Sequence, residues 1–144
     1  MGYEMTATSR EVVEQVMRAG READVEAFAG LMAPDASIEW PYRPPGAPAG
    51  VRGRAEIRAF LAEGAGKLVR FDEYRDVVLH ETTDPEVIIV EYAAYGTVIR
   101  TGAPFHQTVI AVIRVRGGQV LSYRDYLNPL VLAEVLGSGP AHRS

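Results

Sequence analysis

The second half of the chain contains four long segments rich in β-branched and aromatic residues, and this pattern constrains the fold most. Short clusters of turn residues separate these segments, and one of them, Gly117-Gly118, predicts a tight hairpin. The first half instead places apolar residues at helical spacing, as in Val12, Val13 and Val16. Helices followed by strands predict an α+β fold with helices packed on one face of an antiparallel sheet. The four expected strands cover residues 68–80, 86–100, 105–116 and 119–127.

Three helices and one short strand are expected ahead of those segments. Thr8 or Ser9 can cap the first helix, Gly20 interrupts it, and Asp24 can cap a second helix that ends at Pro34. A strongly curved antiparallel sheet wrapped around these helices would form a cone with an apolar pocket, and a flat two-layer sandwich is the alternative. Residues 1–8 are expected to be a loose leader, 36–40 a strand, 41–50 an irregular loop and 53–63 a helix.

The composition narrows the functional classes. A chain of 144 residues is most simply one domain, 1–144, with room for a sizeable core. A net charge of −4 without a basic run argues against nucleic acid as a partner, and the absence of cysteine excludes disulfides, thiolate metal sites and cysteine nucleophiles. No apolar run approaches the roughly 18 residues that span a bilayer, and no secretory signal is recognisable, so a soluble cytoplasmic protein that does not bind membranes is expected.

The segment ending in Asp125 carries the main candidate for chemistry. Alternate side chains of a strand share a face, so Tyr123, Asp125 and Leu127 are expected to point together toward an apolar interior. Burial raises the pKa of a carboxyl group, by up to about 3–5 units when burial is complete. Asp125 is therefore a candidate general base and general acid, and the hydroxyl of Tyr123 could stabilise an oxyanion or bond the carboxylate.

Other polar residues on neighbouring strands are candidates of the same site. Strand parity places Gln107 on the inner face and His106 on the outer face unless a bulge shifts the phase; a histidine is also a possible acid or base. Glu91 is the one acid in the middle of its segment and shares a face with Tyr95. It is expected either to face the cavity or to reach a sheet edge or pair with an arginine.

Trp40 and Tyr42 lie beside the proline-rich loop and could close the mouth of a pocket, or they could be ordinary packing aromatics. Glu91, His106 and Asp125 come from three different strands and lack the spacing of metal ligands, so no metal site is expected. Neither a Gly-x-Ser-x-Gly elbow nor a glycine-rich phosphate loop is present. Proton transfer by a pocket carboxylate needs no organic cofactor.

Four stretches together resemble the SnoaL-like polyketide cyclase group of the nuclear-transport-factor-2-like superfamily. This superfamily also holds ketosteroid isomerases, limonene epoxide hydrolases and the phenazine-biosynthesis A/B proteins. The resemblance covers nearly the whole chain. It is carried by Ala33-Pro34-Asp35-Ala36, by Val51-Arg52-Gly53-Arg54, by the stretch from Thr101 to Gln107, and by Tyr123-Arg124-Asp125-Tyr126-Leu127-Asn128-Pro129.

This resemblance implies a usually dimeric α+β cone with a deep apolar pocket. Asp125 matches the acidic residue that several of these groups carry on the last strand, and His106 and Gln107 fall where cyclases have polar pocket residues. Tyr-Arg-Asp-Tyr also resembles the epoxide hydrolases, but those enzymes add an arginine and a second aspartate on an earlier strand. The corresponding stretch from Val90 to Tyr95 lacks that pair.

The sequence therefore predicts a small-molecule enzyme in which Asp125 transfers protons on a polyketide-like or other cyclic carbonyl ligand. The reaction would be a cyclisation, an isomerisation or a dehydration. A non-catalytic ligand-binding or assembly module is the first alternative, and epoxide opening of the limonene-epoxide-hydrolase type is the second. Ile110, Val112 and Tyr126 on the outer face of the sheet predict a homodimer, since a monomer would leave these apolar groups exposed.

Overall fold

The computed structural model describes residues 7–64 and 67–137 and confirms the predicted α+β fold. None of the helices within these residues is long and apolar enough to cross a membrane. In chain order the elements are α1 (Ser9–Arg21), α2 (Val25–Gly30), β1 (Met32–Glu39), β2 (Gly50–Arg52), α3 (Arg54–Glu63), β3 (Val69–Glu81), β4 (Val87–Val98), β5 (Pro104–Arg116), β6 (Gln119–Tyr126) and α4 (Pro129–Gly137).

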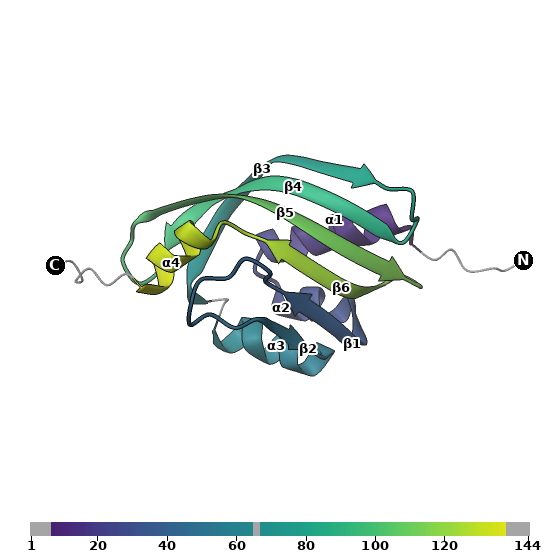
Figure 1. Ribbon diagram of the computed structural model, residues 1–144, viewed down its shortest axis with the longest axis horizontal. Coiled ribbons are helices and arrows are strands. Elements are labelled where there is room, and N and C mark those ends of the chain that lie inside the picture. The colour runs from purple at the N-terminus through teal and green to yellow at the C-terminus, as the bar shows by residue number, and fades with distance from the viewer. Residues whose placement is uncertain (1–6, 65–66, 138–144) are drawn as a thin grey trace, which may run out of the picture.

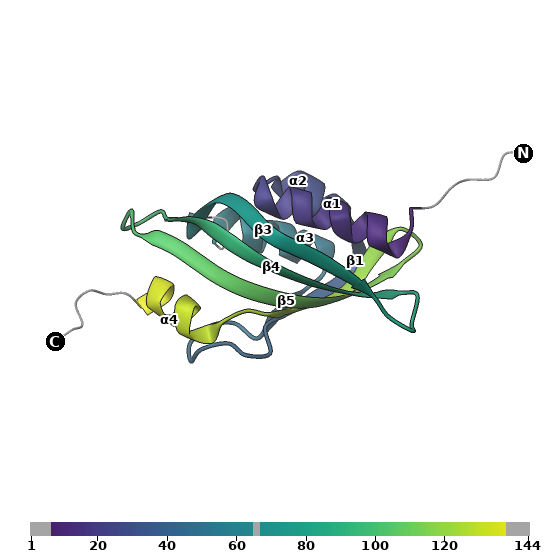
Figure 2. The ribbon, with the colours of Figure 1, turned by 90° about the horizontal axis from the view of Figure 1, so that it is seen from above.

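The six strands form one curved sheet in the order β2-β1-β6-β5-β4-β3, with α1, α2 and α3 against one of its faces (Figures 1 and 2). All neighbouring strands are antiparallel except β1 and β6, which run parallel and pair Ile38 with Tyr123. The sequence predicted an antiparallel sheet, whereas the observed sheet is mixed because it contains this one parallel pair. This parallel pair places the end of β1 next to the end of β6, where Asp125 lies.

Local sequence explains how α1 begins and which side it buries. Thr8 accepts a hydrogen bond from the Glu11 backbone N–H at 3.1 Å, and Glu11 accepts one from the Thr8 N–H at 2.9 Å. This capping box satisfies two backbone donors at the helix start. Val12, Val13 and Val16 are buried against the sheet. Thr8 is therefore the predicted cap and no part of a leader; residues 1–6 lie outside the described residues.

One boundary and two short elements differ from the sequence-based expectation. Strand β1 begins at Met32, so the second helix ends at Gly30 and not at Pro34. Met32 is fully buried and pairs with Val120, and this tertiary contact outweighs its helical propensity. The short β2 was not expected, and only its first residue, Gly50, belongs to the loop predicted over residues 41–50. Helix α4 was not anticipated, because its residues are apolar all round and give no helical period.

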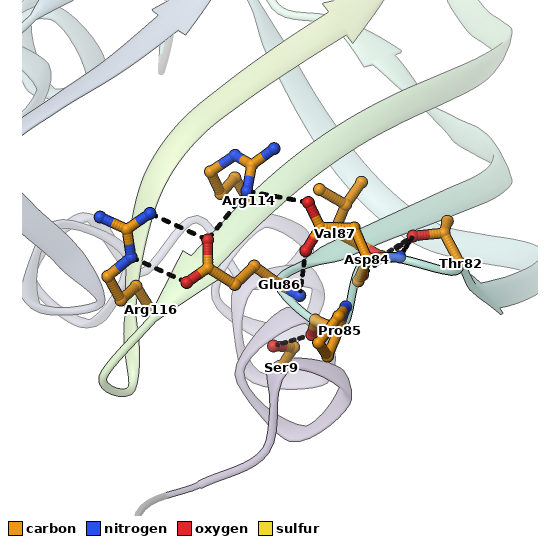
Figure 3. Close-up of polar contacts among 8 residues, drawn as sticks. All are labelled: Ser9, Thr82, Asp84, Pro85, Glu86, Val87, Arg114 and Arg116. Carbon is orange, nitrogen blue, oxygen red and sulfur yellow. Dashed lines mark hydrogen bonds and ion pairs between the residues drawn. The ribbon is translucent and has the colours of Figure 1, made fainter.

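Two acidic side chains just before β4 form ion pairs with two arginines of β5 on the outer side of the molecule (Figure 3). Glu86 accepts hydrogen bonds at 2.8 Å from both Arg114 and Arg116, and Arg114 also reaches Asp84 at 3.2 Å. Hydrogen bonds from Arg116 and then Arg114 lower the pKa of Glu86 to about 2. This carboxylate is therefore held in its charged form by the two guanidinium groups.

Candidate active site

A cavity of about 330 Å³ lies between the helices and the inner face of the sheet. Most of its wall is apolar, with contributions from α1, α2, α3, α4 and the strands β1 and β3–β6. This volume lies within the range of small-molecule sites, which combine an apolar wall with a few placed polar groups. Five polar side chains reach the cavity from four strands: Tyr74, Tyr92, Gln107, Tyr123 and Asp125.

Asp125 is the ionisable group that this wall isolates. Its Oδ2 accepts a hydrogen bond from the Trp40 indole N–H at 3.2 Å. Its Oδ1 is buried and has no hydrogen-bond partner among the residues that the structure describes. Burial raises the pKa of Asp125 to about 6, although the hydrogen bond from Trp40 acts in the opposite direction. One oxygen is thus held by the indole of Trp40, while the other is enclosed without a hydrogen-bond donor.

The sheet register explains why these two side chains meet. Asp125 faces inward on β6 and is paired with Ala111 of β5. Trp40 directly follows β1, and the preceding pair joins Glu39 to Arg124 across the parallel strands. The Trp40 ring also packs on Phe60 at 5.3 Å, which fixes the direction of its N–H.

Three tyrosines surround the carboxylate, of which only Tyr123 was expected. Burial, and then the negative charge of Asp125, raise the pKa of Tyr74. Burial likewise raises the pKa of both Tyr92 and Tyr123, with electrostatic contributions from Asp125. All three hydroxyls therefore stay protonated, and a hydrogen bond between Tyr92 and Tyr123 occupies one of their three donors.

The sequence does not single out Tyr74 and Tyr92, for two different reasons. The pairing of β3 with β4 shifts between Phe71 and Glu73, so simple alternation along β3 fails to predict that Phe71 and Tyr74 both face the cavity. Tyr92 lies on the face opposite to Glu91, among apolar neighbours that give a tyrosine no distinguishing signal. Only the alternation along β4 was available to place Tyr92.

Gln107 reaches the cavity from β5, as parity predicted. Its Oε1 accepts a hydrogen bond from the Asn128 backbone N–H at 2.9 Å, which orients the amide. The NH₂ group of Gln107 has no acceptor within residues 7–64 and 67–137. It can therefore donate to a ligand oxygen.

The structure does not bring the other candidates to this cavity. His106 and Tyr95 lie on the outer face, where their rings stack at 4.5 Å, because β4 and β5 pair without a register shift there. Glu91 also points outward, and its Oε2 lies 2.5 Å from Nε2 of His80. Its partner is thus a histidine and not the arginine that was considered.

Tyr42 does not line the cavity either. Its side chain is 61% exposed and packs edge-on against Tyr126 at 5.3 Å. Of the two aromatics expected at the pocket, the structure thus places Trp40 in the wall and Tyr42 outside it.

A curved sheet whose helices enclose an apolar chamber with one isolated acid defines a class of cone-shaped α+β proteins. The chain belongs to the family of SnoaL-like domains, whose model matches residues 13–123. This confirms the resemblance seen in the sequence.

The relatives of the chain carry similar descriptions. It is 35% identical to an uncharacterized PhzA/B-like protein of Pseudomonas aeruginosa, over 90% of each chain. It is 32% identical to an uncharacterized protein of Bacillus subtilis, covering 88% of this chain and 86% of the other. A crystal structure from Bacillus subtilis, provisionally described as an isomerase, superimposes with a TM-score of 0.83 at 31% identity, covering 91% of this chain and 94% of that one.

Proposed function

We propose that the protein is a small-molecule enzyme in which Asp125 acts as general base and then general acid on a cyclic carbonyl substrate. The observation that carries this proposal is the buried, unpartnered Oδ1 of Asp125 in an apolar cavity of about 330 Å³. A carboxylate with a pKa near 6 is more basic than an ordinary aspartate and is still ionised at neutral pH.

The proposed step moves one proton and one electron pair. Oδ1 of Asp125 removes a proton from the carbon next to the carbonyl, and the electrons of that C–H bond form the enolate. The NH₂ of Gln107 and the hydroxyl of Tyr123 donate hydrogen bonds to the enolate oxygen. Return of the proton to another carbon completes an isomerisation. In a cyclisation, the enolate carbon instead attacks a second carbonyl of the substrate, whose C=O electron pair becomes an alkoxide, and the protonated Asp125 returns the proton to that oxygen.

A simple ketone tests this step without knowledge of the natural substrate. β-Tetralone exchanges the protons next to its carbonyl for deuterium when a base forms its enolate, and NMR in D₂O measures the rate. The wild-type protein should accelerate this exchange, with a rate that rises with pH and levels off above about 6. A rate that levels off near the ordinary aspartate pKa of about 4 contradicts the proposal.

The alternatives make different demands on the same cavity. A packed assembly module requires an interior filled by side chains, whereas about 330 Å³ is open here. A pure ligand-binding module would bind β-tetralone without accelerating exchange. Epoxide opening would need a second acid beside Asp125, and Glu91 lies on the outer face with His80.

We also propose that two copies associate through the outer face of the sheet. Ile110 is 43% exposed there, and its strand neighbours Val112 and Tyr126 are half-buried. Ile110 pairs with Tyr126 on β6, and the charged Glu91 and Arg124 lie opposite Ile110 and Val112, so the apolar groups form a patch bordered by two charges. Light scattering should give twice the monomer mass, and a monomer contradicts this part of the proposal.

A further inference from the structure

The segment between β1 and β2 places one unpaired cation at the rim of the cavity. Arg43 lines the cavity together with Ala47 and Pro48 and is exposed to solvent. Among the described residues it has neither an ion-pair partner nor a hydrogen-bond partner, whereas Arg114 and Arg116 are both bound to Glu86. An arginine at the entrance with its five N–H donors unused can bind an anion.

The segment that carries Arg43 is held in place by its own contacts. The backbone N–H of Trp40 donates to the Ala49 carbonyl at 2.9 Å and closes the base of the loop. The Ala47 N–H donates to the Pro44 carbonyl at 3.1 Å, and Pro44 is buried directly beside Arg43. A proline-rich loop fixed at these points loses little further conformational entropy when a ligand binds.

The charges along the cavity differ between its entrance and its interior. Arg43 is the one basic residue that lines it within the described part of the chain. Of the two acids in the wall, Asp24 uses Oδ1 to cap α2 through the Ala27 N–H at 3.0 Å, and Asp125 lies among tyrosines and apolar groups. Near Asp125 an anionic ligand group would face a negative charge at neutral pH, whereas at Arg43 it would face a positive one.

We infer that the substrate carries a carboxylate, or a comparable anion, which Arg43 binds at the rim while the apolar ring system occupies the cavity with its carbonyl toward Asp125. This inference rests on the proposed function and adds the substrate class to it. The planar guanidinium group suits this role because it can hold both oxygens of a carboxylate at once. The same contact would orient the ligand, since only one end of it is charged.

A pair of probes that differ only in charge tests the inference. We choose cyclohexylbutanoate and its primary amide, cyclohexylbutanamide, which share the apolar ring and chain and do not absorb where tryptophan does. Trp40 is the single tryptophan of the chain and lines the cavity, so its fluorescence reports binding of either probe.

The acid should bind at least about five-fold more tightly than the amide, which corresponds to roughly 1 kcal/mol for a partly exposed charge pair. Arg43→Gln should abolish this preference, Arg43→Lys should keep part of it, and added salt should weaken binding of the acid alone. Arg58→Gln, which removes a positive charge from α3 away from the cavity, is the matched control and should leave the preference intact.

Several results would overturn the inference. They are equal binding of the two probes, no binding of either, equal losses for both probes in Arg43→Gln, or the same loss of preference in Arg58→Gln. The exchange of β-tetralone by the wild type and by Asp125→Asn, compared with the preference for the acid probe, separates this inference from the proposed function. If the acid preference persists while the wild type fails to exchange β-tetralone, the proposed function fails alone. If exchange depends on Asp125 and no acid preference is found, the inference fails alone.

Discussion

Glu86 and Asp125 are two carboxylates whose surroundings move their pKa values in opposite directions. Glu86 lies on the outer side, bound at 2.8 Å by Arg114 and Arg116, and its pKa falls to about 2 (Figure 3). Asp125 lies in the cavity with a single neutral donor, and burial raises its pKa to about 6. The carboxylate of Glu86 connects two strands, and both of its oxygens are bound by arginines. The carboxylate of Asp125 lacks a charged partner and keeps its basicity.

The largest expected difference between the two carboxylates is in proton transfer. Asp125→Asn should lower the rate of β-tetralone exchange by about 100-fold or more, in line with the usual contribution of a general base. Glu86→Gln makes the same chemical change outside the cavity and should leave the rate within about two-fold of wild type. Exchange followed by NMR compares both variants, and equal rates for wild type and Asp125→Asn would remove Asp125 from the mechanism.

The two carboxylates should also change stability with pH in opposite senses. The folded protein binds a proton at Asp125 more tightly than the unfolded chain does, so ionisation costs stability as pH rises from about 4 to about 6. A rise from 3.8 to about 6 corresponds to about 3 kcal/mol. The free energy of unfolding of Asp125→Asn, relative to wild type, should therefore be higher at about pH 8 than at about pH 3.5 by that order.

Glu86 should behave in the reverse way, because its pKa is lowered from 4.5 to about 2. The stability that it contributes is complete above about 4.5 and is lost as pH falls through about 2. The advantage of wild type over Glu86→Gln should thus shrink on acidification. Urea titrations of the three proteins at several pH values measure both trends. Parallel curves for wild type and Asp125→Asn would contradict the burial argument.

Much of the inner face could be predicted from the sequence because strands alternate regularly. Parity alone placed Asp125, Tyr123 and Gln107 inside and His106 outside, and the β4–β5 register keeps that alternation along the whole pair. Parity failed for Tyr74, where the register between β3 and β4 shifts. A bulge depends on tertiary packing and leaves no reliable mark on the sequence.

Contacts between residues far apart in the sequence could not be predicted for another reason. Trp40 and Asp125 are 85 residues apart, and they meet because β1 runs parallel to β6. The sequence predicted both strands but not their pairing. Glu91 is a second case, since the sequence left its orientation open and did not predict its partner His80. Arg43 gives no signal in the sequence, because nothing in a proline-rich loop reveals which residues border a cavity.

The exposed apolar side chains on the outer face of the sheet can be tested as a dimer interface. Ile110→Lys places a charge in the middle of the apolar patch with Val112 and Tyr126 and should weaken a homodimer at least about ten-fold. Thr108→Lys, one position of the same face away, adds the same charge nearer the end of β5 and serves as a control. Light scattering over a range of concentrations measures the change. Identical dissociation of the two variants would argue against this patch as the interface.

The smallest expected effect tests the one donor that Asp125 has. Trp40→Phe retains an aromatic ring to pack on Phe60 but removes the N–H that binds Oδ2. That hydrogen bond stabilises the charged carboxylate and lowers its pKa, so the variant should titrate at higher pH, by up to about one pH unit for a single hydrogen bond. The pH profile of β-tetralone exchange should move upward accordingly. A profile that stays in place would mean that burial alone sets the basicity of Asp125 and that the indole positions the carboxylate without tuning it.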